Sequence, residues 1–123
     1  MGEILYKELS YKIVGLAMKV HRALKNGLPE AIYQRALCHE LRKENISYET
    51  ERRTQVVYDG EMIGTFRMDL IVEDAVLLEL KAVDALADQH RSQTLAYLKA
   101  TKLRLGLLIN FGVKSLKVER IVN

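Results

Sequence analysis

The segment Met68–Lys81, which reads MDLIVEDAVLLELK, constrains the fold of this chain more than any other stretch. Asp69 stands at the start of one apolar run, two acidic residues interrupt it, and a second apolar run ends in Glu79 and Lys81. If the acidic pair forms a tight hairpin turn, the two runs are antiparallel strands and Asp69 lies close to the Glu79 end of its partner. Since side chains alternate between the two faces of a strand, Glu79 and Lys81 point the same way. The sequence therefore predicts two carboxylates and one ammonium group at the same edge of a sheet.

Such a cluster of charges is costly to assemble unless a metal ion or a phosphate compensates it. Carboxylates are hard oxygen ligands, and their convergence without Cys or His favours Mg²⁺ or Mn²⁺ over zinc. A lysine beside them can hold a phosphate oxygen or position an attacking water, so the set suits metal-dependent hydrolysis of phosphodiester bonds. The alternative for Glu79 and Lys81 is an exposed ion pair on one strand face. Their apolar neighbours favour burial, and buried carboxylates persist only when they are compensated.

The chain has 123 residues, of which 49% are hydrophobic, and this suits one domain over residues 1–123 with a core of its own. No apolar run approaches the roughly 20 residues that would span a bilayer. The first ten residues lack the apolar core of a signal peptide, and Cys38 is the single cysteine, so we expect a cytoplasmic protein that does not bind a membrane.

Hydrophobic periodicity and turn residues predict helices at about 8–25, 29–44 and 87–100, with Ser10 as a cap near the start of the first. Strands are expected at 46–50 and 55–58, and Asp59-Gly60 predicts a hairpin that leads through Gly64 into the strand of Asp69. A buried strand at 103–111 and a short strand at 116–122 follow. The third helix allows the strand that ends at Lys81 to pair in parallel with the buried strand, giving a mixed α/β domain.

The net charge of +3 permits a partner that carries phosphates without requiring one. The histidines offer an alternative zinc site, but no two of His21, His39 and His90 lie at helical ligand spacing. Tyr33, Gln93 and Tyr97 can also be explained as residues at helix interfaces, and the sequence by itself favours that interpretation.

Several motifs together resemble one known family. The D-x(9)-E-x-K arrangement at Asp69, Glu79 and Lys81 resembles the PD-(D/E)XK nuclease superfamily, in particular its RecB-like branch. The stretch GLPEAIY at 27–33 is similar to the signature of the small bacterial GxxExxY proteins, which are placed in that superfamily. Other similar segments are VH at 20–21, ELKAV at 79–83, QTLAYL at 93–98 and LGLLINF at 105–111.

The resemblance implies a restriction-endonuclease-like core, in which helices flank a mixed β-sheet. Asp69 and Glu79 would bind Mg²⁺ or Mn²⁺, and Lys81 would orient the water or the scissile phosphate. Glu30, from the helix before the sheet, would add a carboxylate at the metal. These four side chains form the catalytic set that the resemblance predicts.

Three more residues enter as supporting members of the site. Gln93 and Tyr97 would line it from the helix after Lys81, and His21 is included because it matches the family pattern. The chain departs from the family name at Met68, which stands where the proline would be.

The resemblance predicts a nuclease that acts on nucleic acid, DNA rather than RNA. The alternative is a catalytically silent module on the same fold, which binds nucleic acid or protein and retains the charges as a structural cluster. A small domain without an added recognition element has little surface for reading sequence. We therefore also expect a homodimer or a partner protein.

Overall fold

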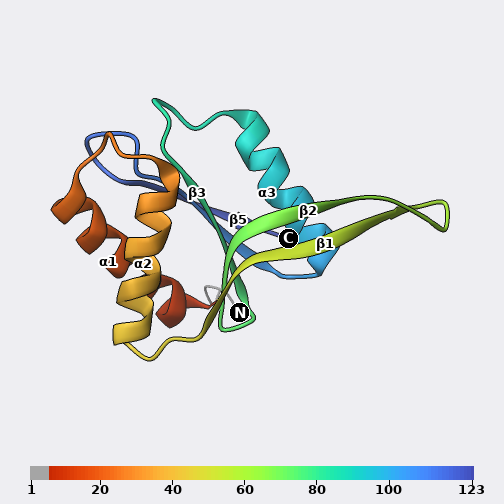
Figure 1. The fold of residues 1–123 in the computed structure, drawn as a ribbon, viewed down its shortest axis with the longest axis horizontal. Coiled ribbons are helices and arrows are strands. Elements are labelled where there is room, and N and C mark those ends of the chain that lie inside the picture. Colours follow the sequence, from red (N-terminus) through yellow and green to blue (C-terminus); the bar gives the residue numbers. More distant parts are fainter. Residues whose placement is uncertain (1–5) are drawn as a thin grey trace.

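The computed structural model describes residues 6–123 of the chain. Helices and strands follow in the order α1 (Lys7–Leu24), α2 (Glu30–Lys43), β1 (Tyr48–Tyr58), β2 (Glu61–Val72), β3 (Val76–Lys81), α3 (Asp88–Thr101), β4 (Leu105–Asn110) and β5 (Lys117–Val122) (Figure 1). Residues 1–5, which belong to the segment without a signal-peptide core, lie outside the described residues. Within residues 6–123, every helix is too short or too polar to cross a bilayer.

The five strands form one mixed sheet in the order β1-β2-β3-β4-β5. Neighbours are antiparallel except β3 and β4, which run parallel, with Val76 opposite Leu105 and Lys81 opposite Asn110. Helix α3 makes the crossover between them, as parallel neighbours require. The predicted mixed α/β fold and its parallel pair are therefore confirmed.

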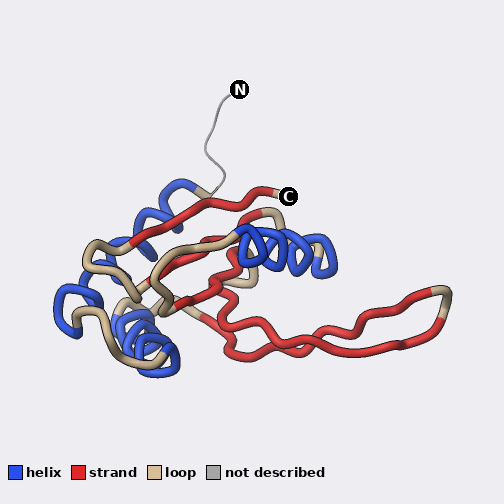
Figure 2. Tube along the Cα trace, turned by 90° about the horizontal axis from the view of Figure 1, so that it is seen from above, coloured by secondary structure: helices blue, strands red, loops and turns tan. Residues whose placement is uncertain are grey.

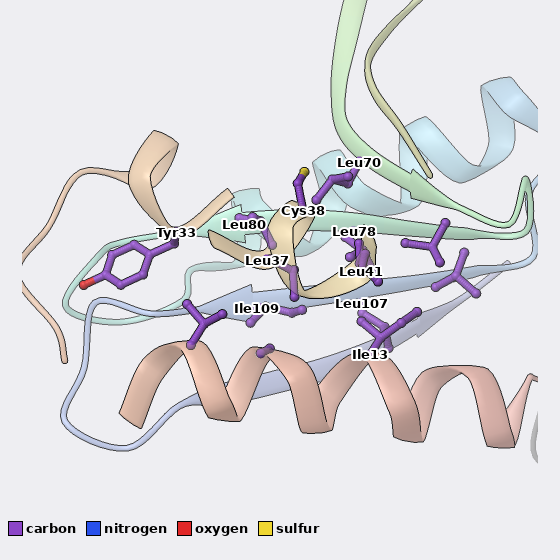
Figure 3. Packing of buried hydrophobic residues seen from close by; sticks show 14 of the residues in the cluster. Ile13, Tyr33, Leu37, Cys38, Leu41, Leu70, Leu78, Leu80, Leu107 and Ile109 are labelled. Carbon is purple, nitrogen blue, oxygen red and sulfur yellow. The ribbon is translucent and has the colours of Figure 1, made fainter. Parts of the chain in front are cut away.

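Helices cover both faces of the sheet. On one face α1 and α2 bury a large cluster against the strands, of which Figure 3 shows Ile13, Leu37, Leu78 and Ile109. On the other face Leu98 of α3 packs with the second cluster, which includes Leu77. Alternation along β3 thus sends the side chains of odd-numbered residues towards α3, and Glu79 and Lys81 share that side.

The first hairpin begins as predicted, but its first strand is longer than expected. Asp59 and Gly60 both have positive φ, 53° and 79°, which matches the turn that joins strands through two residues. β1 is continuous from Tyr48 to Tyr58, not two strands at 46–50 and 55–58. The charged residues between those segments remain in the strand because most of β1 is exposed, with one register shift after Val56.

This hairpin projects from the body of the molecule as an arm (Figure 2). Its far end exposes apolar side chains, since no other element covers both faces of a two-stranded ribbon there. Tyr58 is 70% exposed and Ile63 is 59% exposed. The near end of β2, by contrast, enters the core, and the strand is fully buried at Leu70.

Helix starts differ slightly from the sequence expectation. α1 begins at Lys7, so Ser10 lies inside the first turn and is not the cap; its hydroxyl donates to the carbonyl of Lys7 at 3.2 Å. Pro29 is the N-cap of α2, with φ −63°, and Glu30 is the first helical residue. The proline fits because its ring fixes φ and this position needs no backbone N–H. Pro29 therefore fixes the start of α2 at Glu30.

Candidate active site

The site is built on the opposition of Asp69 and Glu79. The register of β2 with β3, in which Leu70 lies opposite Leu78, brings the two acids across from each other. The backbone N–H of Asp69 donates to Glu79 Oε2 at 3.0 Å, and the backbone N–H of Leu80 donates to Asp69 Oδ2 at 2.8 Å. The hairpin that makes this register possible turns at Glu73 and the two residues after it, one residue more than predicted.

Burial sets the charge state of this pair. Glu79 is only 3% exposed, and burial, followed by the negative charge of Asp69, raises the pKa of Glu79 to about 8. Burial also raises the pKa of Asp69, while the N–H of Leu80 and the charge of Lys81 act to lower it. Two carboxylates this close cannot both carry a free charge without compensation. The pair therefore attracts a cation or retains a proton near neutral pH.

Glu30 and Lys81 act on the same pair. Glu30 is exposed as a residue, but partial burial of its carboxyl group raises its pKa, while the charge of Lys81 lowers it and that of Asp69 raises it. The backbone N–H of Ala82, next to Lys81, also acts to lower the pKa of Glu30. Within residues 6–123, no carboxylate lies within 4 Å of the Lys81 ammonium, so this cation is not committed to a salt bridge. The charges of all four predicted residues thus influence one another, whereas, among these four in the described chain, hydrogen bonds join only the segments of Asp69 and Glu79.

Of the two predicted residues on α3, only Tyr97 interacts with the pair. Its ring stacks on Phe66 of β2 with centroids 4.2 Å apart and planes inclined by 5°. Burial, then the charges of Glu79 and Asp69, raise the pKa of its hydroxyl. Gln93 lies one turn earlier on α3; it is exposed and makes no hydrogen bond to any residue of the described chain.

His21 lies in a different part of the structure. Its ring is buried at the end of α1, where Nε2 is 2.8 Å from the carbonyl oxygen of Val113. The ring is also tilted against Phe111, with centroids 6.2 Å apart. Among the described residues, none of its interactions involves the carboxylates of the site. Its position explains a structural role, which is to hold α1 to the loop after β4.

Tyr33 also has a structural role. Its ring stacks on Phe111 at 4.6 Å, and its hydroxyl accepts from the N–H of Leu28 at 3.2 Å and donates to the carbonyl of Lys25. These bonds fold the loop between α1 and α2 onto the body, as expected for a helix-packing residue.

Two amides position the site and were not predicted to do so. Gln34 Nε2 donates to the carbonyl of Asp69 at 2.8 Å and so connects α2 to β2. Asn110 is 1% exposed; its oxygen accepts from the N–H groups of Val83 and Gly112, and its amide donates to the Val83 carbonyl at 2.9 Å. The signal for Gln34 was its spacing, four residues after Glu30 on one helix face.

Glu51 is a further acid near Asp69, and the sequence did not predict it there. It follows Thr50, which pairs with Leu70, so it stands beside Asp69 on the neighbouring strand, and its charge raises the pKa of Asp69. Its own φ is 54°, an uncommon conformation for a residue with a side chain. Nothing in its sequence context distinguished it from the other charges of an exposed strand.

The donor set fits a hard divalent cation. Asp69, Glu79 and Glu30 offer oxygen ligands alone, and Asp69 and Glu79 each use one carboxylate oxygen for a backbone N–H, which leaves the other oxygen available. Within residues 6–123, no three His, Cys, Asp or Glu side chains already surround one point as metal ligands. Glu30 is exposed and can change rotamer. The type of donor atoms and the raised pKa of Glu79, and not a preformed ligand geometry, therefore support a site for a divalent cation.

A mixed sheet with helices on both faces, and acids on adjacent strands with a lysine on the same face, defines the class of nuclease-like α/β proteins. The sequence matches the PD-(D/E)XK nuclease superfamily over residues 7–121, and the chain belongs to that superfamily. Members of this superfamily generally use divalent metal ions, typically Mg²⁺, and act on nucleic acid.

Comparison with solved structures supports the fold. The protein in the "Crystal structure of SSO0001" is similar, with a TM-score of 0.58 and 20% sequence identity. The match covers 96% of this chain and 57% of that one, so this chain spans little more than half of the larger protein. No curated protein matches the chain.

Proposed function

We propose that this chain is a divalent-metal-dependent nuclease that hydrolyses phosphodiester bonds in DNA. The observation that carries the proposal is the pairing of Asp69 with Glu79, on which Glu30 and Lys81 both act. Within the superfamily we assign the chain to the GxxExxY family of the RecB-like branch, on the motif GLPEAIY at 27–33. Superfamily membership and the buried acids support the activity; the choice of DNA over RNA is part of the proposal.

Asp69, Glu79 and Glu30 would hold Mg²⁺ or Mn²⁺. When bound, such an ion supplies a water of lowered pKa and offsets the charge that develops on the phosphate. The side chains of the site would bind the ion and orient the substrate. The raised pKa of Glu79 means that the pair, left alone, keeps a proton near neutral pH, and a cation would replace this proton.

Lys81 has a separate role. Its ammonium lies on the same side of β3 as Glu79 and is not held in a salt bridge within the described chain. From there it can bind a non-bridging phosphate oxygen, or hold the attacking water in line with the phosphorus. The hydroxyl of Tyr97, fixed by the stack on Phe66, would donate to the phosphate or to the water next to it.

One observation favours a second candidate function, a module that binds nucleic acid or protein without cutting. The hydrogen bonds between the acids and the backbone also extend the contact between β2 and β3, so the pair could serve as a structural brace alone. In that case the chain would act as a homodimer or bind a partner protein.

A cleavage assay separates the two functions. The protein is incubated with Mn²⁺ and single-stranded, duplex or branched DNA, or RNA, and compared with Lys81→Ala, Asp69→Ala and Glu79→Ala. We expect cleavage of DNA by the unchanged protein and a loss of about 100-fold or more in each variant, with the circular dichroism spectrum retained. The matched control is Lys99→Ala, which removes an exposed lysine of α3.

Unchanged cleavage in all three variants would place the activity elsewhere or in a contaminant. Binding of DNA without cleavage of any substrate, in the presence of Mn²⁺, would favour the module.

A further inference from the structure

An open groove of about 550 Å³ lies between α2 and the first half of β1. The chain passes directly from the end of α2 to β1, so the two elements diverge from a common base (Figure 1). The walls are mostly polar. The lining residues used below are Gln34, Arg35, Arg42, Tyr48, Thr50 and Glu51.

Two residues that line the groove adjoin the candidate active site. Gln34, on the α2 wall, donates to the carbonyl of Asp69, and Glu51, on the β1 wall, influences the charge of the Asp69 carboxylate. A chain-like ligand with one group at Asp69 and Glu79 would therefore have its neighbouring part close to this groove. The groove leads away from the acids along α2 towards Tyr48.

Two arginines give the groove its charge. Arg35 and Arg42 are seven residues apart on α2, which places them on the same helix face and about 10.5 Å apart along the axis. Within residues 6–123 neither pairs with a carboxylate, whereas Arg52, Arg67 and Arg91 all do.

A contact with Tyr48 orients the guanidinium group of Arg42 within the groove. Its Nη1 donates to the hydroxyl of Tyr48, which orients the guanidinium along the β1 wall. The one acid of the lining, Glu51, is at the end near the site and lies 3.7 Å from Arg67. The rest of the groove presents an amide, hydroxyl groups and two guanidinium groups, which are suited to phosphate oxygens.

We propose that this groove binds the sugar–phosphate backbone of one nucleic acid strand, next to the phosphate that is cleaved. Arg35 and Arg42 each bind one phosphate, and the neutral polar residues contact the sugars between them. This inference rests on the proposed function, because it assigns the path of the substrate to the same site. Contacts of this kind position a strand and carry no sequence preference.

Binding is measured by fluorescence anisotropy, with a labelled single-stranded DNA oligonucleotide in EDTA, so that cleavage cannot interfere. We expect Arg35→Ala and Arg42→Ala each to raise the Kd roughly tenfold, by the same factor for mixed-sequence and oligo-dT strands. The slope of log Kd against log salt should fall by about 0.7 for each arginine removed. Arg22→Ala is the control, since Arg22 is also an exposed helical arginine without an ion pair in the described chain, but it lies on α1.

The proposal that this groove binds DNA would be overturned if the double variant Arg35→Ala/Arg42→Ala had the Kd and salt slope of the Arg22→Ala control. It would also be overturned if the unchanged protein did not bind DNA. Thermal unfolding of each variant shows whether it is folded. If Arg42→Ala does not fold, Arg42→Lys replaces it in the test, because lysine keeps the positive charge. The result is independent of cleavage. If the protein binds DNA through the groove but never cleaves it, the proposed nuclease function is refuted. If the protein cleaves DNA and the variants bind as well as the unchanged protein, the proposed binding role of the groove is refuted.

Discussion

Asp69 and Glu79 hold each other in place across two strands: the N–H of Asp69 donates to Glu79 Oε2 at 3.0 Å, and the carboxylate of Asp69 accepts from the residue after Glu79 at 2.8 Å. Each acid is therefore positioned by the backbone that carries the other. Their separation does not depend on flexible side chains alone. Such an arrangement would preorganise the pair for a cation, and the burial of the two acidic groups costs stability.

The first prediction concerns the stability of the metal-free protein. The pKa of Glu79 is about 8 in the folded chain, above the ordinary value of 4.5, so the folded state binds the proton more tightly than the unfolded state. The stabilisation by this proton is complete below pH 4.5 and is lost as the pH rises towards 8. In EDTA, the Tm should therefore fall by several °C as the pH rises from 5.5 to 8.5, because Glu79 loses its proton over this range. About 1 kcal/mol corresponds to roughly 4 °C in a domain of this size.

Glu79→Gln removes the titrating group with little change of shape, and this contribution should disappear in the variant. Glu61→Gln, at an exposed position of β2, is the control and should keep it. An equal dependence of Tm on pH in the unchanged protein and in Glu79→Gln would mean that Glu79 is ionised in the folded chain without a metal.

The second prediction tests the amide that ties α2 to the site. Gln34→Ala removes the bond to the carbonyl of Asp69 and should lower the free energy of unfolding by about 1 kcal/mol. Because Asp69 would then be less well fixed, the cleavage rate should fall by roughly tenfold or more. Urea denaturation and the Mn²⁺ cleavage assay measure the two effects. Gln55→Ala, on the exposed part of β1, should change neither; equal effects of both variants would deny Gln34 its positioning role.

The third prediction uses two glycines in different surroundings. A Cβ on Gly112 would lie 2.3 Å from the backbone nitrogen of Val83 and 2.5 Å from its oxygen, too close for either to remain. Gly112→Ala should therefore displace the segment after Lys81 and destabilise the protein by about 1–3 kcal/mol. Gly15, inside α1, has no neighbour within 4 Å of such an atom, so Gly15→Ala should stabilise the protein by about 0.5–1 kcal/mol.

Thermal or urea denaturation of the two glycine variants gives both signs in one experiment. Destabilisation by Gly15→Ala, or tolerance of Gly112→Ala, would show that the packing around these positions differs from that described.

The fourth prediction separates the ring of Tyr97 from its hydroxyl. Tyr97→Phe keeps the stack on Phe66, so the free energy of unfolding should change by less than about 0.5 kcal/mol. The hydroxyl near Glu79 and Asp69 is lost, and cleavage should slow several-fold. Phe66→Ala, which removes the stack, should destabilise the protein by at least the 0.5–1.5 kcal/mol of such a pair. Full activity in Tyr97→Phe would leave the ring as the sole contribution of this residue.

The parts of the site that could be predicted depend on contacts between neighbours in the sequence. Asp69 and Glu79 face each other because a three-residue loop joins their strands, and the length of such a loop fixes the register of the hairpin. The turn at Asp59 and Gly60 follows from the same local chemistry, since both residues accept positive φ.

The remaining features depend on packing between distant segments. Gln34 reaches Asp69 only because α2 crosses the sheet at that point, and the sequence does not encode the crossing locally. The same holds for His21, which matched the family pattern yet contacts the loop after β4. The continuity of β1 was missed because charged residues interrupt its apolar alternation, which is tolerated in a strand that is exposed along most of its length.

The most direct test of the account is a calorimetric titration of the protein with Mn²⁺ at pH 7.5. We predict that one chain binds Mn²⁺ at a site that is lost in Asp69→Asn and in Glu79→Gln and weakened in Glu30→Gln, while Glu61→Gln binds as the unchanged protein does. Binding that is equally strong in Glu79→Gln and in the unchanged protein, or no binding at all, would contradict the claim that Asp69 and Glu79 form a metal site.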